Sequence, residues 1–126
     1  MRGVLAICIG AGLASVALAS ARAPEKRCGI LANPTPANWW LNDRDGEWII
    51  GTQGGFQAEG IDVMPESFYK KGWVRTNGNY GYRCACLTVD SDRKNKRITR
   101  IRSAQALPMK RCNADKALQR ALGRGD

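Results

Sequence analysis

The sequence YGYRCACLTVD, residues 80–90, is the stretch that decides the fold. Its residues alternate so that Tyr82, Cys84 and Cys86 share one face of an extended chain, while Ala85 and Leu87 share the other. Both faces carry apolar groups, which is typical of a strand that is covered on both sides. The stretch therefore predicts a long central strand with two cysteines on one face.

The two cysteines of this strand belong to a set of four, with Cys28 and Cys112. An even number in a short exported chain is typical of disulfides, and the one-residue spacing without any histidine is unlike a zinc site. A Cys84–Cys86 bond is disfavoured because alternate strand residues lie about 6.6 Å apart and point the same way. A turn near residues 90–96 would carry Cys112 back to the earlier end of the strand. This favours Cys84–Cys112 with Cys28–Cys86 over the exchanged pairing, which stays open.

Shorter β-prone runs lie between turn signals such as Asp45-Gly46. They predict strands at residues 47–52, 73–76 and 98–107. Near the end of the chain, Asn113 and Gly123 are typical first and last caps, and they predict a helix over residues 114–122. The predicted fold class is α+β: a small, mainly antiparallel β domain held by two disulfides, with a short C-terminal helix.

Residues 1–21 have the order of a secretory signal peptide. Arg2 is the only charge before an apolar run over residues 4–19, and Ala19-Ser20-Ala21 supplies the small residues that a signal peptidase needs. The run is shorter than the roughly 20 strongly apolar residues of a membrane span, so no span is expected. We expect cleavage after Ala21, which leaves a single exported domain over residues 22–126 in the periplasm or outside the cell.

The chain is basic, with a formal charge of +9 that becomes +8 when Arg2 is removed. Much of this charge falls between residues 93 and 111, where no acidic residue occurs. Such a block attracts anionic polymers, and it predicts an anion-binding surface. The alternative is a solvated strand and hairpin tip whose charges prevent edge pairing. The candidate anion-binding residues are Arg93, Lys94, Lys96, Arg97, Arg100 and Arg102.

Three tryptophans, Trp39, Trp40 and Trp48, lie close together in the sequence and are candidate contacts to a partner. Trp39 and Trp40 point to opposite sides of an extended chain, so that one can enter the core while the other meets solvent or a partner. The alternative is that all these rings fill a small β core. The expected partner is an anionic envelope polymer or a periplasmic protein, and nucleic acid is not expected.

No set of residues forms a catalytic signature. The chain has no histidine, the commonest general base and metal ligand, and no spacing of its carboxylates selects a pair. Neither a metal nor a cofactor is therefore predicted. We interpret the chain as a non-catalytic binding or interaction module of the bacterial cell envelope. The alternative is a small periplasmic hydrolase or enzyme inhibitor with a carboxylate cleft.

A succession of motifs covers residues 28–112. In order, these are Cys28-Gly29, Asn33-Pro34-Thr35-Pro36, Asn38-Trp39-Trp40, Asp43-Arg44-Asp45-Gly46, Gln53-Gly54-Gly55 and Cys84-Ala85-Cys86. The chain thereby resembles a family of small exported bacterial proteins catalogued as a domain of unknown function, number 4087. The resemblance implies a single exported domain with paired cysteines, and it assigns no functional residue.

Overall fold

The strand expected at residues 80–90 is the centre of the sheet. In the computed structural model, which describes residues 7–13 and 22–124, it is β5 (Tyr80–Asp92). One edge of β5 pairs with β1 (Glu25–Thr35), and the other pairs with β4 (Val74–Asn77) and β6 (Arg97–Leu107). The central position predicted from the sequence is thus confirmed. The predicted cleavage site after Ala21 lies outside the described residues.

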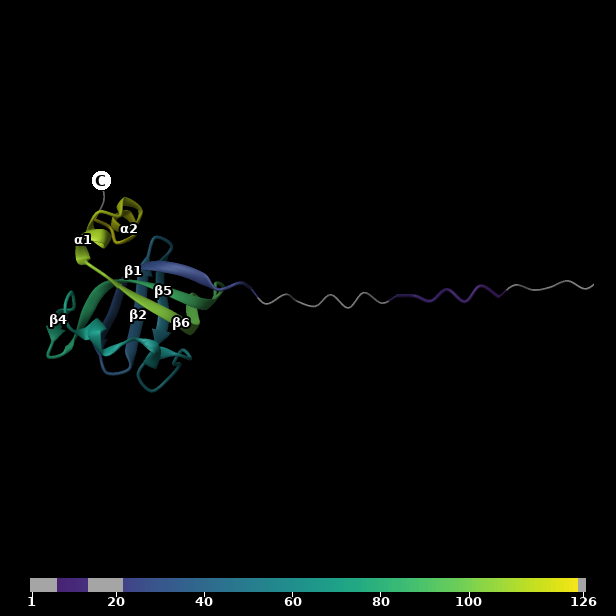
Figure 1. Cartoon of the computed structure of the whole chain (residues 1–126), viewed down its shortest axis with the longest axis horizontal. Coiled ribbons are helices and arrows are strands. Elements are labelled where there is room, and N and C mark those ends of the chain that lie inside the picture. The colour runs from purple at the N-terminus through teal and green to yellow at the C-terminus, as the bar shows by residue number, and fades with distance from the viewer. Residues whose placement is uncertain (1–6, 14–21, 125–126) are drawn as a thin grey trace, which may run out of the picture.

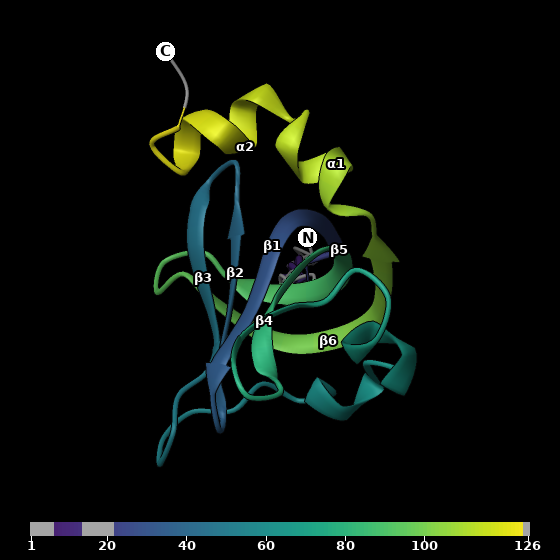
Figure 2. The same ribbon diagram turned by 90° about the vertical axis from the view of Figure 1, so that its left-hand side faces the viewer.

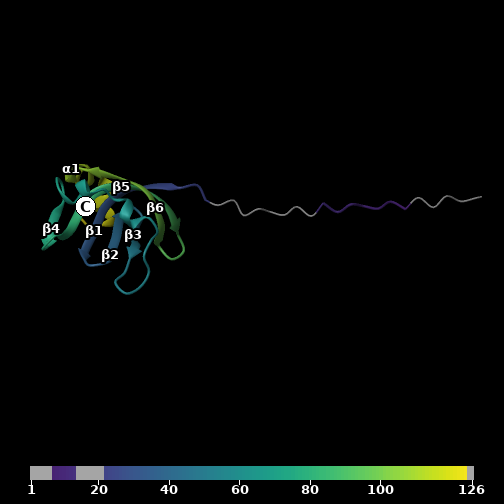
Figure 3. The same ribbon diagram turned by 60° about the horizontal axis from the view of Figure 1, so that its bottom comes forward.

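The sheet closes on itself into a barrel. The second half of β1 also pairs with β2 (Asn38–Asp43), and β2 forms a hairpin with β3 (Gly46–Gly51). A single parallel pair between β3 and β6 completes the ring β1-β2-β3-β6-β5-β1, so the sheet is mixed rather than purely antiparallel. Figure 3 shows these strands following one another around the barrel. Apart from the added strand β4, this order is that of an oligonucleotide/oligosaccharide-binding (OB) barrel.

Strands β1 and β2 were not predicted from the sequence, because prolines 34 and 36 indicate a turn there. Nevertheless, burial alternates along both strands as in a strand with one inner face. Gly29 allows the two strands to approach closely, since a Cβ at this position would lie 1.9 Å from the carbonyl oxygen of Asn42. A side chain there would force β1 away from β2.

The interior of the barrel is filled by alternate residues of all the long strands. Leu87 and Val89 of β5 are fully buried at its centre. On β6, Ile98 and Ile101 both point inward although they are three residues apart. The register with β5 shifts twice here, so that β6 bulges and re-aims its side chains. This explains why the sequence shows helical spacing in a strand.

A buried arginine fastens the segment between β3 and β4 to one end of the barrel. The segment contains two 3-10 turns, η1 (Ile61–Val63) and η2 (Glu66–Tyr69). The guanidinium of Arg83, which is 3% exposed, donates to the carbonyls of Phe68 and Lys71 at 2.7 and 3.0 Å. It thereby satisfies backbone acceptors that would otherwise be buried without partners.

Two short helices follow β6 and lie together at one end of the strands (Figures 1 and 2). They are α1 (Met109–Asn113) and α2 (Lys116–Ala121), where the sequence predicted one helix over residues 114–122 with Asn113 as its cap. The predicted start of the helix is wrong. Asp115 is the N-cap of α2, because its carboxylate accepts a hydrogen bond from the amide of Leu118. No helix of the described residues is long and apolar enough to cross a membrane.

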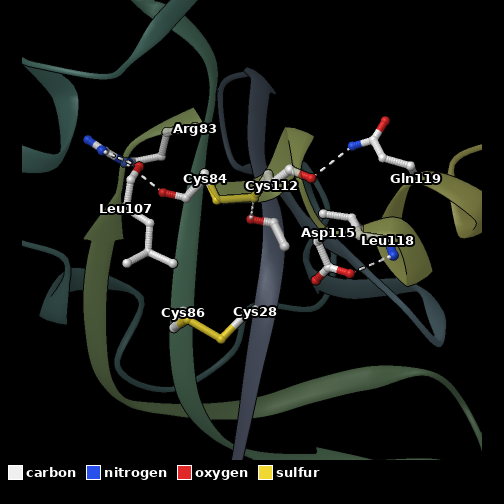
Figure 4. The surroundings of a disulfide bond; sticks show 10 residues. Cys28, Arg83, Cys84, Cys86, Leu107, Cys112, Asp115, Leu118 and Gln119 are labelled. Carbon is white, nitrogen blue, oxygen red and sulfur yellow. Dashed lines mark hydrogen bonds between the residues drawn. A yellow bond between two sulfur atoms is a disulfide. The ribbon is translucent and has the colours of Figure 1, made fainter. Parts of the chain in front are cut away.

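The predicted disulfide pairing is confirmed. Cys28 bonds Cys86 directly across β1 and β5, and Cys84 bonds Cys112 of α1. Figure 4 shows both bonds on the outer side of β5, with the second bond tying α1 to the barrel. Around this bond a small second core forms, with Leu118 of α2 buried in it. The disulfide and this core fix the helices over the outside of the barrel.

Candidate binding face

A continuous row of apolar side chains crosses the outside of the barrel next to the helices. The register places one residue from each of five neighbouring strands at the same level. All of them are half-buried and point away from the core. From β4 to β3 they are Val74, Tyr82, Ala32, Trp40 and Ile49.

A groove of about 440 Å³ lies between this row and the helices. Its floor contains Tyr82 and Ile30 of the barrel, and Met109 and Leu122 line it from the helical side. The helices owe their position to the Cys84–Cys112 bond, so the groove depends on that bond. A hollow that combines apolar walls with a few polar groups is the usual form of a ligand site.

Three polar side chains line the same groove: Asn42 of β2, Asn113 at the end of α1, and Arg124 after α2. Within the described part of the chain, none of the three side chains takes part in a hydrogen bond or ion pair. Each amide offers both a donor and an acceptor, and the guanidinium offers donors only. These groups are therefore available to a ligand in the groove.

The structure separates the three tryptophans that were candidate contacts. Trp39 and Trp48 lie in the core, 8% and 2% exposed, and Trp48 donates from Nε1 to Asp43 at 3.0 Å. Their burial removes both rings from the surface that a partner can reach. Trp40 points outward in the apolar row. Tyr82, its neighbour across β1, was not predicted as a contact, although the alternation of residues 80–90 already placed it opposite the core residues.

The six predicted anion-binding residues are exposed, and half of them are paired with acidic side chains. Arg93, Arg100 and Arg102 make ion pairs with acids distant in sequence. Lys96 lies 4.5 Å from the ring of Trp48 and donates to the carbonyl of Asp45, and Arg97 lies 5.3 Å from the ring of Phe56. Lys94 is exposed in the turn between β5 and β6. The acidic partners are Glu25, Glu59 and Asp90, at 2.7, 2.7 and 2.9 Å.

A second charged cluster closes the end of the barrel opposite Arg83. Arg27, 9% exposed, donates to Glu25, Asp43 and Asp45 at 2.6, 2.9 and 3.1 Å, and its guanidinium lies 3.8 Å from the ring of Trp48. Burial lowers the pKa of Arg27, but the hydrogen bonds to Asp43, Asp45 and Glu25 outweigh it and raise that pKa. Sequence reasoning missed this residue, since nothing around it marks a buried arginine.

This cluster is an ion-pair network rather than an acid-base pair. Burial raises the pKa of Glu25, but its hydrogen bonds to Arg93 and Arg27 outweigh that effect and hold the pKa below its usual value. A general acid needs a raised pKa at neutral pH, so Glu25 is shifted in the opposite direction. Within residues 7–13 and 22–124, no group of three or more histidine, cysteine or acidic side chains could hold a metal ion.

Comparison with known proteins adds one finding. A family model described as "Protein of unknown function (DUF4087)" matches residues 22–119, which confirms the resemblance inferred from the motifs. No curated protein and no solved structure matches the chain.

Proposed function

The chain belongs to the DUF4087 family, whose description assigns no activity, and from its geometry we propose that it is a non-catalytic interaction module of the bacterial cell envelope. The groove between the helices and the outside of β1, β2 and β5 is its binding face. The observation that carries this proposal is the combination in one hollow of apolar walls with three polar side chains that make no hydrogen bond or ion pair among the described residues. A hollow that places a few polar side chains beside apolar walls is the usual form of a ligand site, because the polar groups can fix the orientation of what binds there.

We further propose that the protein is exported to an oxidising compartment. Two disulfides hold the domain together, and such bonds persist outside the reducing cytoplasm. The signal-peptide pattern of residues 1–21 agrees with that location. We therefore place the protein in the periplasm or outside the cell, with a second envelope protein as its partner.

The two other candidate functions have less support. An anionic polymer that used Arg93, Arg100 and Arg102 would have to displace the carboxylates that already pair with them. A hydrolase or inhibitor with a carboxylate cleft would use the Arg27 cluster, where one guanidinium is shared by three carboxylates. Such sharing gives each carboxylate a charge-assisted hydrogen bond, and the pKa of Glu25 is held below its usual value, opposite to what a general acid needs.

The experiment that tests the proposal is affinity capture from an envelope extract of the native host, with the groove filled in one variant. Ala32→Tyr adds a ring in the middle of the apolar row, where a strand tolerates tyrosine. Thr88→Tyr is the matched control, because Thr88 is also outward on β5 but does not line the groove. We expect a partner that wild type and Thr88→Tyr retain and Ala32→Tyr loses. A partner held equally by all three proteins would contradict the proposal.

A further inference from the structure

We propose that the groove binds an extended peptide segment in which apolar side chains alternate with at least one acidic residue. This inference rests on the proposed function and names the chemistry of its partner. Three features of the groove carry it: the apolar lining, the two amides, and the cation Arg124 on its helical side.

The lining selects apolar side chains. Ile30, Val74, Met109 and Leu122 present aliphatic surface to the groove, beside the ring of Tyr82. Leucine-sized or aromatic side chains would exclude water from this surface, and Met109 can adapt its shape to them. A sugar chain fits less well, because hydroxyls held against aliphatic walls would lose hydrogen bonds to water without replacement.

The two amides suit a peptide backbone. Asn42 lies on the barrel side of the groove and Asn113 on the helical side. A carboxamide carries one acceptor and two donors, so it can pair with both the N–H and the C=O of a peptide unit. A peptide in the groove must have such partners, since an unpaired backbone group buried there would be costly.

The charges favour an acidic segment and fix its direction. Among the described residues no acidic side chain lines the groove, and Arg124 stands among the lining residues. Glu47 is exposed on β3 directly beside Asn42, which makes the β3 side unfavourable for a carboxylate. The acidic residue is therefore expected at the Arg124 side. The net charge of the mature chain, +8 without Arg2, adds long-range attraction for the same segment.

The dimensions suit a short extended chain. The groove spans β4, β5, β1 and β2, which are three strand spacings of about 4.8 Å, or about 14 Å in all. An extended peptide advances about 3.3 Å per residue, so about four residues fit along it. Alternate side chains would point into the groove, and the others would remain free to carry charge.

Selection from a phage-displayed library of random linear peptides tests the inference, with the disulfide-intact mature protein as bait and Ala32→Tyr as counter-bait. We expect enriched peptides with apolar residues two positions apart and an aspartate or glutamate beside them. One enriched peptide is then synthesised and titrated. It should bind Arg124→Gln about three- to ten-fold more weakly than wild type, because the variant loses one charge-assisted contact. Arg100→Gln, whose arginine is exposed and already paired with Glu59, is the matched control and should bind as wild type does.

Two outcomes would overturn the inference and leave the proposed function standing. One is enrichment of apolar peptides without acidic residues, together with unchanged affinity in Arg124→Gln. The other is tight binding of an oligogalacturonide, tested in parallel, that Ala32→Tyr abolishes while no peptide is enriched. If Ala32→Tyr retains the envelope partner and also selects the same peptides as wild type, the proposed function and this inference both fail.

Discussion

The groove beneath α1 and α2 and the outer side of β6 differ in how their polar groups are satisfied. On β6, Arg100 and Arg102 meet carboxylates at 2.7 and 2.9 Å, so their charge is largely compensated within the molecule. In the groove, Asn42, Asn113 and Arg124 have no side-chain partner among the described residues. The difference teaches that a block of charge in a sequence does not reveal which of its members are paired with acids in the fold, because those acids can lie far away in the chain.

The largest expected effect comes from removing a disulfide, and the two disulfides are expected to differ in their effect on partner binding. Replacing both cysteines of a bond by alanine should lower the free energy of unfolding by about 3.5 kcal/mol for Cys84–Cys112 and about 4 kcal/mol for Cys28–Cys86, given loops of 28 and 58 residues. Only the first bond holds α1 over the groove. Chemical denaturation should therefore show similar losses, whereas partner binding should disappear in the Cys84/Cys112 variant alone. Equal loss of binding in both double variants would contradict the expectation that only the Cys84–Cys112 bond, which holds the helices, shapes the groove.

The next effect is confined to the groove. Ala32→Tyr should weaken partner binding by more than about ten-fold, because its ring takes the space of a ligand side chain. Its melting temperature should stay close to that of wild type, because Ala32 is half-buried on the outer face and not in the core. Titration calorimetry and thermal melting check the two expectations. If Ala32→Tyr has a clearly lower melting temperature than wild type, the binding comparison is made with Tyr82→Arg instead.

Acidification should affect the charged end of the barrel. The pKa of Glu25 is lowered in the folded state from an unfolded value near 4.5, so its contribution is fully present above that pH and is lost as the pH falls through the folded pKa. We expect the free energy of unfolding, measured in urea at a series of pH values, to decline below about pH 4.5. Glu25→Gln should flatten that decline, whereas Glu47→Gln, outside the ion pairs of the described residues, should not. If the free energy of unfolding of Glu25→Gln declines as steeply as that of wild type, Glu25 is not responsible for the pH dependence.

The smallest effect concerns the turn between β5 and β6. Neutralising Arg93, Lys94, Lys96 and Arg97 together should change the free energy of unfolding by about 1 kcal/mol or less, since exposed charges contribute little. Partner binding should change less than about two-fold, as measured by calorimetry. Retention on an anionic polymer should fall in this variant if the turn binds anions, and it should fall steeply with salt in wild type. If this variant fails to bind the envelope partner, the binding surface is the basic stretch of β6 and the preceding turn, and not the groove.

Sequence patterns predicted the features that depend on local alternation and on chain reversal. Strand β5, its two cysteines and the return of Cys112 could all be read from residues 80–112, and the structure confirms them. Strand β1 was missed because Pro34 indicates a turn, and because its longest pairing is with β5, whose residues lie more than forty-five positions away. The closure of the barrel rests on one parallel pair, Ile49 with Arg97, which leaves no periodic signal.

The candidate site was predictable only in part. The opposite orientation of Trp39 and Trp40 follows from the chain alone, and the structure places Trp40 on the outer face. The groove could not be foreseen, because it needs the short helix that begins after Pro108 and the disulfide that holds it. The compensation of the basic stretch depends on contacts such as Arg93 with Glu25, across 68 positions of the sequence.

The account's central claim is that the partner contacts the groove and not the basic strand. Photo-crosslinking in the native host tests it most directly, with benzoylphenylalanine placed at Tyr82 in one protein and at Arg102 in another. Both positions are outward on neighbouring strands, but only Tyr82 lines the groove. We predict a crosslinked partner from position 82 and none from position 102. A partner crosslinked from position 102 alone would contradict the account.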